Sequence, residues 1–213
     1  MFEFKPTMNM KRSLLAIICI CCTLAANALN PIRVNYQGTR PTISDFVSAY
    51  FAANDQDEEE CENDESTNAA AYAWEQHLKG EPQEENVTLT IDERNGYVVY
   101  EWRQDDNMLK VEACYWNEAD GKHKLFAYNI ACFTDGKYDP GQYDRLEFWR
   151  YNNAAKTMTF CEDTGVDMVY RTDDNVRGSY ALPRTGKDIT VTLWYKSGPK
   201  QKTLKWNGRR FAH

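Results

Sequence analysis

Catalytic signatures are what this sequence most lacks. It has three histidines, His77, His123 and His213, and no H-E-x-x-H segment, which excludes a zinc protease of that type. No G-x-S-x-G elbow surrounds a serine, so nothing supports a Ser-His-Asp hydrolase built on such an elbow. The four cysteines after residue 28 form no C-x-x-C pair, and their long spacings argue against a zinc site. We therefore predict no catalytic residue, no metal site and no cofactor.

The sequence also lacks an apolar run of about 20 residues, the length that a membrane-spanning helix needs. Its apolar stretch at residues 13–26 is shorter, and the basic pair Lys11-Arg12 precedes it. The stretch ends in Ala26-Asn27-Ala28, the small-x-small pattern that signal peptidases cleave. This order predicts a signal peptide over residues 1–28 and a mature chain from Leu29. We expect export to the periplasm, the cell surface or the extracellular space, with no transmembrane helix after cleavage.

A lipid anchor is the alternative fate for this segment, because three cysteines lie inside the apolar run. A lipoprotein signal requires a small residue directly before the modified cysteine. Here the residues before Cys19, Cys21 and Cys22 are isoleucine, isoleucine and cysteine. Cleavage without lipid attachment is therefore the favoured prediction.

Basic residues are scarce over most of the mature chain. Without residues 1–28, 22 Lys and Arg stand against 31 Asp and Glu, a net charge of −9. Nucleic acid is excluded as a partner, because its binding requires a basic face. Eight of the acids lie in residues 55–65, which we predict to be a loop because like charges repel. Residues 189–213 show the opposite pattern, with six bases and no acid.

Four cysteines remain after the predicted cleavage: Cys61, Cys114, Cys132 and Cys161. An even number of cysteines in an oxidising compartment predicts disulfides. Four cysteines allow three pairings, and the sequence does not choose among them. We expect at least one bridge, and we expect it to include Cys61.

Apolar residues recur at helical spacing in two segments before residue 86. The first segment carries one apolar stripe: Ile43, Phe46, Val47, Tyr50 and Phe51. The second, roughly residues 67–79, is followed by Gly80 as a C-cap, and its inner side is marked by Ala70, Ala71, Trp74 and Leu78. We predict that residues 29–85 form a helical N-terminal segment interrupted by the acidic loop 55–65.

From Asn86 onward the hydrophobic period changes to two, which is typical of β-strands. Asn95-Gly96 is a strong signal for a tight hairpin turn. About ten short strands separated by frequent turns predict an antiparallel β-sandwich or barrel over residues 86–213. The predicted fold class is therefore α+β, with two N-terminal helices followed by an antiparallel β domain.

Large aromatic side chains are the unusual feature of the predicted strands. In each strand they occupy the parity opposite to the aliphatic residues. Rings on a wet face can stack on sugars or anchor a protein partner. On this interpretation the predicted ligand-binding residues are Trp102, Trp116, Trp149, Trp194, Tyr128 and Tyr151. In the alternative interpretation the strands are buried on both faces, against the helices or a second sheet, and the same rings form core.

Paired carboxylates offer a second functional hypothesis, a hydrolase of the cell envelope. The candidates are Glu101, Glu112 and Glu147 in strands and Asp135, Asp139 and Asp144 in a loop. Charges on solvated strand faces explain the same residues without any catalysis. We therefore favour a protein that is not an enzyme.

The last strand region reads Trp206-Asn207-Gly208, followed after two residues by Phe211. This W-N-G-x-x-F ending resembles that of many uncharacterised exported proteins of Gram-negative bacteria. The resemblance covers six residues and implies a periplasmic or surface-exposed β protein, without implying an activity. Together with the signal peptide and the aromatic residues, it leads us to predict an exported, non-enzymatic binding or interaction protein of the bacterial cell envelope. A glycan or an envelope protein is the expected partner.

Overall fold

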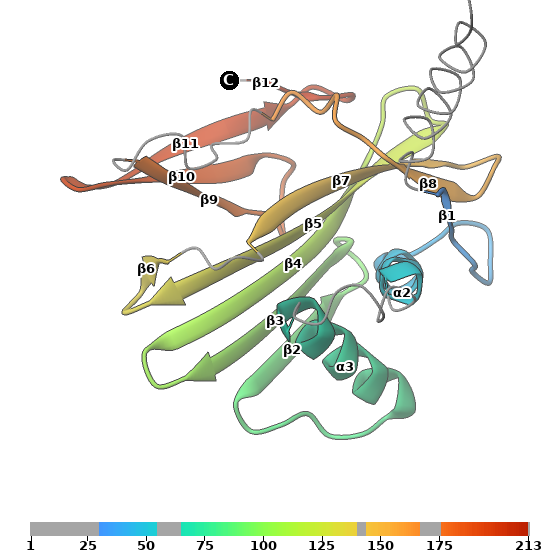
Figure 1. Cartoon of the computed structure of the whole chain (residues 1–213). Coiled ribbons are helices and arrows are strands. Elements are labelled where there is room, and N and C mark those ends of the chain that lie inside the picture. Colours follow the sequence, from blue (N-terminus) through green and yellow to red (C-terminus); the bar gives the residue numbers. More distant parts are fainter. Residues whose placement is uncertain (1–29, 55–64, 140–143, 167–175, 213) are drawn as a thin grey trace, which may run out of the picture. The chain divides into compact units, whose positions relative to one another are not determined.

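Two helices and two antiparallel sheets build the part of the chain that the computed structural model describes, residues 30–54, 65–139, 144–166 and 176–212 (Figure 1). The fold class is therefore α+β, as predicted. Pro31–His213 form one compact unit. The predicted signal peptide, most of the acidic run and Cys61 lie outside the described residues. Within the described ranges, no helix has the length and apolar character needed to span a membrane.

The larger sheet has eight strands, and neighbouring strands run antiparallel. Short β6 (Lys137–Tyr138) pairs with β5, and the other strands follow the order β1 (Ile32–Arg33), β8 (Thr157–Phe160), β7 (Arg145–Asn152), β5 (His123–Thr134), β4 (Asn107–Asn117), β3 (Tyr97–Gln104) and β2 (Val87–Asp92). The predicted Asn95-Gly96 turn joins β2 to β3, and Gly96 has a φ of 65° there. A Cβ at Gly96 would lie 2.7 Å from the ring of Tyr115, so this turn requires glycine.

The smaller sheet has the order β12 (Phe211–Ala212), β11 (Gly198–Trp206), β10 (Ile189–Tyr195) and β9 (Val176–Ala181). The described strands form two open sheets and no closed barrel. Strand β11 has nine residues and contains a proline, Pro199, next to its first residue. Pro199 is tolerated in β11 because β12 pairs only with Lys205 and Trp206, which leaves the start of β11 at a sheet edge.

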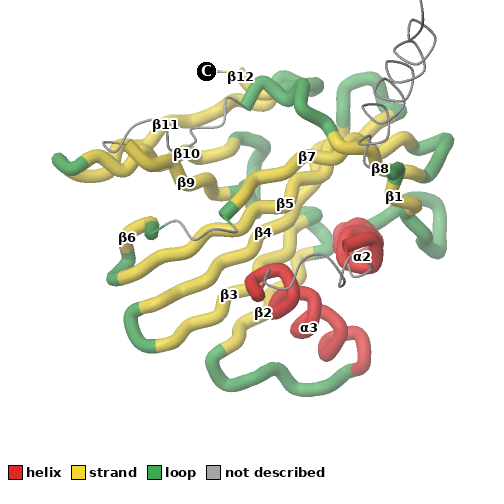
Figure 2. Tube along the Cα trace, viewed as in Figure 1, coloured by secondary structure: helices red, strands yellow, loops and turns green. Residues whose placement is uncertain are grey.

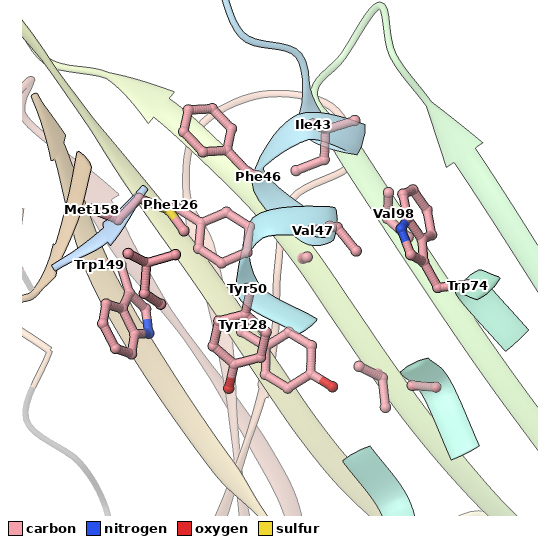
Figure 3. Close-up of a cluster of buried hydrophobic side chains, with 14 of the residues drawn as sticks. Ile43, Phe46, Val47, Tyr50, Trp74, Val98, Phe126, Tyr128, Trp149 and Met158 are labelled. Carbon is pink, nitrogen blue, oxygen red and sulfur yellow. The ribbon is translucent and has the colours of Figure 1, made fainter. Parts of the chain in front are cut away.

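Helices α2 (Ile43–Asn54) and α3 (Glu65–Lys79) cover one face of the larger sheet (Figure 2). Before α2, the backbone N–H of Thr42 donates a 2.7 Å hydrogen bond to the Asp45 carboxylate, which caps the helix. The side chains of α2 that are buried against the sheet are Ile43, Phe46, Val47 and Tyr50 (Figure 3).

Helix α3 is fastened to α2 by the indole N–H of Trp74, which donates a 3.0 Å hydrogen bond to the Ser48 hydroxyl. Its buried side consists of Ala70, Ala73 and Trp74. Leu78, predicted to lie on this side, is 63% exposed. All residues from 77 to 80 are exposed, so the last turn of α3 extends beyond the packed region.

The larger sheet is buried on both faces, which creates two separate cores. One core lies between this sheet and the helices and includes Phe46, Trp74 and Phe126. The other lies between the two sheets, where residues of the larger sheet such as Phe148 share a cluster with Val191 of β10. The central strands are thus apolar on both parities because each face packs against a different layer.

Candidate functional site

The six aromatic residues predicted to bind a ligand lie in three separate places. Tyr128, Trp149 and Tyr151 are buried in the core between the sheet and the helices, and Trp102 packs at its margin. Trp116 is buried between the two sheets. Trp194, partly exposed, lies in β10 on the parity opposite to buried Val191 and Leu193, hence on the outer face of the smaller sheet. The expectation that these rings share one exposed face is wrong.

The pairing register between strands explains this correction. Alternation within one strand sorts its residues onto two faces of the sheet. It does not determine which residues of the neighbouring strand lie on the same face, because that depends on the pairing register. Trp102 pairs with Leu109, so an aromatic and an aliphatic residue share one face. Trp116 pairs with Leu125, and both face the smaller sheet. Five of the six aromatic residues, all except Trp194, therefore pack in or against one of the two cores.

Trp102 lines a pocket of about 150 Å³ between α3 and the edge of the larger sheet. The floor comes from β2 and β3 and consists of Val87, Tyr100 and Trp102. The roof comes from one stripe of α3 at helical spacing, Ala69, Tyr72, Ala73 and Gln76. The loop between α3 and β2 closes one end with Pro82, Gln83 and Glu84.

The short side chains of Ala69 and Ala73 explain why space remains under α3. Larger residues at these two roof positions would reach toward the floor rings of Tyr100 and Trp102. Alanine cannot do so, which leaves Val87 and Trp102 partly exposed at the floor, whereas Tyr100 is 3% exposed. Tyr72, at the same pocket, is 53% exposed and marks the side that opens to solvent.

The end wall of the pocket is held by hydrogen bonds. Gly80, with a φ of 72°, ends α3, and its N–H donates to the His77 carbonyl at 3.0 Å. The N–H of Glu81 donates to the Gln76 carbonyl at 2.9 Å, which completes a Schellman cap. The Gln83 amide then donates to the Ala73 carbonyl at 3.0 Å, so the loop is fastened back onto the helix.

Glu84 sets the electrostatics of the pocket. Burial and the nearby Glu84 carboxylate together raise the pKa of Tyr100 to about 12. A tyrosine hydroxyl is protonated at neutral pH even without this shift, so Tyr100 has a proton to donate in a hydrogen bond. With one carboxylate and no base among its lining residues, the pocket suits a neutral or cationic group better than an anion.

The size of the pocket limits what it can hold. Pockets for drug-sized ligands span roughly 300–1,000 Å³, about twice this volume or more. A single ring or the end of a chain is the appropriate scale. Trp102 is recognisable from the sequence as a candidate, but Tyr72, Gln76, Glu84 and Tyr100 are not, because only the packing of α3 on β3 brings them together.

Four of the six carboxylates considered for hydrolysis form ion pairs with bases. Ion pairs join Glu101 to Arg103 at 3.0 Å and Glu112 to Lys110 at 2.9 Å. The same two-residue spacing along one strand joins Glu147 to Arg145 at 3.1 Å. In the loop, Asp139 pairs with Arg177 at 3.5 Å, Asp144 accepts a hydrogen bond from the Cys132 N–H, and Asp135 is exposed. These contacts account for the strand carboxylates as structural ion pairs.

A small polar cluster in the β4–β5 hairpin escaped the sequence analysis. Ligand atoms of Glu118, Asp120 and His123 lie within 4.8 Å of one another. Internal partners already occupy them. Glu118 accepts a 2.7 Å bond from Arg150, and Asp120 pairs with His123 Nδ1 at 2.6 Å. This cluster fastens the hairpin turn.

Two of the cysteines predicted to form disulfides are buried between the sheets. Three strand-to-strand steps lie between them. Cys114 in β4 pairs with Ala127 in β5, and Ala127 pairs with Phe148 in β7. The Phe148 carbonyl then accepts a hydrogen bond from the Cys161 N–H. Three strand spacings of about 4.8 Å separate these two cysteines by roughly 14 Å, too far for a bridge. Among the described cysteines, Cys114, Cys132 and Cys161, no disulfide forms.

Comparison of the chain with protein-family models, with curated proteins and with solved structures finds no match. The functional argument therefore rests on the pocket and on the sequence.

Proposed function

We propose that this chain is an exported, non-enzymatic binding protein of the bacterial cell envelope, and that the pocket between α3 and β3 is its binding site. One observation carries this proposal: the pocket combines the partly exposed ring of Trp102 with the carboxylate of Glu84 on a hydrogen-bonded loop. A flat aromatic face beside a few polar groups is the usual composition of a site for a small ligand.

A saccharide ring is the ligand that this lining suits best. The apolar face of a sugar stacks on an indole, and its hydroxyls need donors and acceptors at the edge of the ring. Tyr100 supplies a hydroxyl, Gln76 an amide and Glu84 a carboxylate. An amino sugar would add an ammonium group, which is attracted both to Glu84 and to the aromatic faces.

The proposed location depends on the predicted signal peptide. The segment has the order of a signal peptide: a basic pair comes first, an apolar run follows, and a small-x-small cleavage site ends it. We expect protein isolated from the native cell to begin at Leu29. Intact-mass measurement tests this directly, and a cellular product that retains Lys11-Arg12 would contradict export.

Saturation-transfer NMR with glucosamine and glucose as probes tests the pocket. We expect signal transfer to both sugars, stronger for glucosamine because of its charge, and loss of transfer in Trp102→Ala. Phe160→Ala is the matched control, since Phe160 is an exposed aromatic residue (41%) away from the pocket. Transfer that persists in Trp102→Ala, or that is lost equally in both variants, would contradict the assignment of the site.

A further inference from the structure

The C-terminal strands carry a concentration of exposed positive charge. The bases are Lys196, Lys200, Lys202, Lys205, Arg209 and Arg210, and all six are exposed. No acid lies between Ile189 and Ala212, and none of the six forms an ion pair with any described residue. We call these six residues the basic hairpin surface. It lies on a chain whose predicted mature net charge is −9.

In the larger sheet, by contrast, several bases form ion pairs with neighbouring acids. Arg103, Lys110 and Arg145 each pair with a glutamate two residues away on the same strand face. In β11 no acid occupies any position, and within the described parts of the chain no acid forms an ion pair with Lys200 or Lys202. A row of like charges is unfavourable unless a partner of opposite sign covers it.

Protection of a sheet edge explains only part of this pattern. Lysines on an edge strand discourage pairing with other chains, and β11 is an edge strand at Lys200 and Lys202. Lys196 lies instead in the turn between β10 and β11, and Arg209 and Arg210 lie in the turn before β12 (Figure 1). The charge therefore follows the whole length of the hairpin and extends past its edge.

We propose that the basic hairpin surface binds an acidic polysaccharide. The bases of β11 run from Lys200 to Lys205, about 17 Å of extended strand, so they are spread over more than one sugar unit of an extended chain. Partly exposed aromatic rings lie at the tip on both faces of the hairpin, Tyr195 on the face of Lys200 and Lys202 and Trp194 on the face of Lys205. The Lys200 ammonium lies 5.2 Å from the centre of the Tyr195 ring, and a 2.8 Å hydrogen bond from Trp194 to Ser179 fixes the indole. Such rings can stack on sugars between the charge contacts.

A membrane surface fits this arrangement less well. Lys200 and Lys202 lie on one face of β11 and Lys205 on the other, so a flat surface cannot meet all three. The exposed large apolar side chains of the described chain are Tyr72, Leu78 and Phe160, and none belongs to the hairpin. An interfacial segment would place apolar residues there to enter the acyl region.

Binding of polygalacturonate, a linear carboxylated polysaccharide, tests the proposal by calorimetry with the whole purified protein. We expect binding that weakens between 0.05 and 0.5 M salt, because the distance over which exposed charges interact falls from about 14 Å to about 4 Å over this range. The triple variant Lys200→Gln/Lys202→Gln/Lys205→Gln should bind about tenfold more weakly, since each exposed contact contributes modestly. Dextran, which is uncharged, should not bind.

The matched control is Lys122→Gln/Lys137→Gln/Lys156→Gln, which removes three exposed bases of the larger sheet and changes the net charge equally. It should bind polygalacturonate within about twofold of the unmodified protein, and both variants should keep its thermal midpoint. Equal loss in both variants would overturn the proposal. So would binding of polyglutamate as tightly as polygalacturonate, of phosphatidylglycerol vesicles alone, or self-association of the protein in place of polysaccharide binding. These outcomes do not depend on the sugar pocket at Trp102.

Discussion

The hydroxyl of Tyr97 donates a 2.7 Å hydrogen bond to the carboxylate of Glu112 in the space between the two sheets. Glu112 is 2% exposed, and its carboxylate has three further donors: Lys110 Nζ at 2.9 Å, Asn129 Nδ2 at 3.2 Å and the Leu182 N–H at 3.4 Å. Because the last donor follows β9, this buried charge connects the larger sheet to the smaller one.

Glu112→Ala should therefore be strongly destabilising. It leaves an ammonium, a phenol, an amide and a backbone N–H without their acceptor, and breaking a buried pair in this way costs about 3–5 kcal/mol. Glu101→Ala is the control, because Glu101 is a partly exposed partner of Arg103 and should cost about 0–1 kcal/mol. Urea unfolding measures both, and similar losses would contradict a buried connecting role for Glu112.

The different burial of Trp149 and Trp194 leads to a second prediction. Trp149 is 4% exposed and meets Phe160 and Tyr50 edge-on, with centroid distances of 5.5 and 6.1 Å. Trp149→Ala should cost about 3–5 kcal/mol in the free energy of unfolding. Trp194→Ala, at a partly exposed site with one hydrogen bond to Ser179, should cost about 1 kcal/mol. A well-folded Trp149→Ala with unchanged stability would argue that this ring is not core.

Local sequence patterns identify single helices and turns of this protein. They do not show which faces of different elements pack against each other. The 3.6-residue spacing of Ile43, Phe46, Val47 and Tyr50 is enough to identify the buried side of α2, because every contact of that stripe is to one sheet. The turn at Gly96 is also readable, since the requirement for positive φ is local.

Other features depend on the pairing of strands that are far apart in the sequence, and local patterns do not reveal them. Cross-strand register decides which core receives Trp116 and which receives Trp149, and no local pattern encodes it. The pocket depends on where α3 packs along β3, so Glu84 and Tyr100 come together there only in the folded chain. Absence of a disulfide between Cys114 and Cys161 likewise follows from strand order, which sequence spacing does not reveal.

The turn between β4 and β5 should show a pH dependence centred on Asp120. The hydrogen bond from His123 is the main cause that lowers the pKa of Asp120 from 3.8 to about 2, and the Lys122 N–H adds to it. The folded pKa lies below the unfolded one, so the stabilising contribution is present above pH 4 and disappears as pH falls to 2. NMR titration of the carboxyl should give this pKa, and His123→Ala should return it toward 3.8. An Asp120 pKa that does not respond to His123→Ala would contradict the pairing.

The last prediction concerns Gly165, which supports the closing strand β12. Gly165 has a φ of 72°, and a Cβ there would lie 2.2 Å from the Phe211 carbonyl oxygen. The Phe211 N–H donates a 2.7 Å hydrogen bond to the Thr164 carbonyl, so this backbone cannot move away without releasing Phe211 from the core between the sheets. Gly186 has a similar φ of 86° but nothing within 4 Å of such a Cβ.

Comparing the two alanine variants separates backbone strain from steric overlap. Gly186→Ala should cost about 1–2 kcal/mol, the penalty of a left-handed conformation for a residue with a Cβ. Gly165→Ala should cost about 1–3 kcal/mol more, because overpacking is added to the same strain. Urea midpoints of the two variants, measured side by side, test this difference. If the two midpoints coincide, the contact between Gly165 and Phe211 does not hold β12 in place.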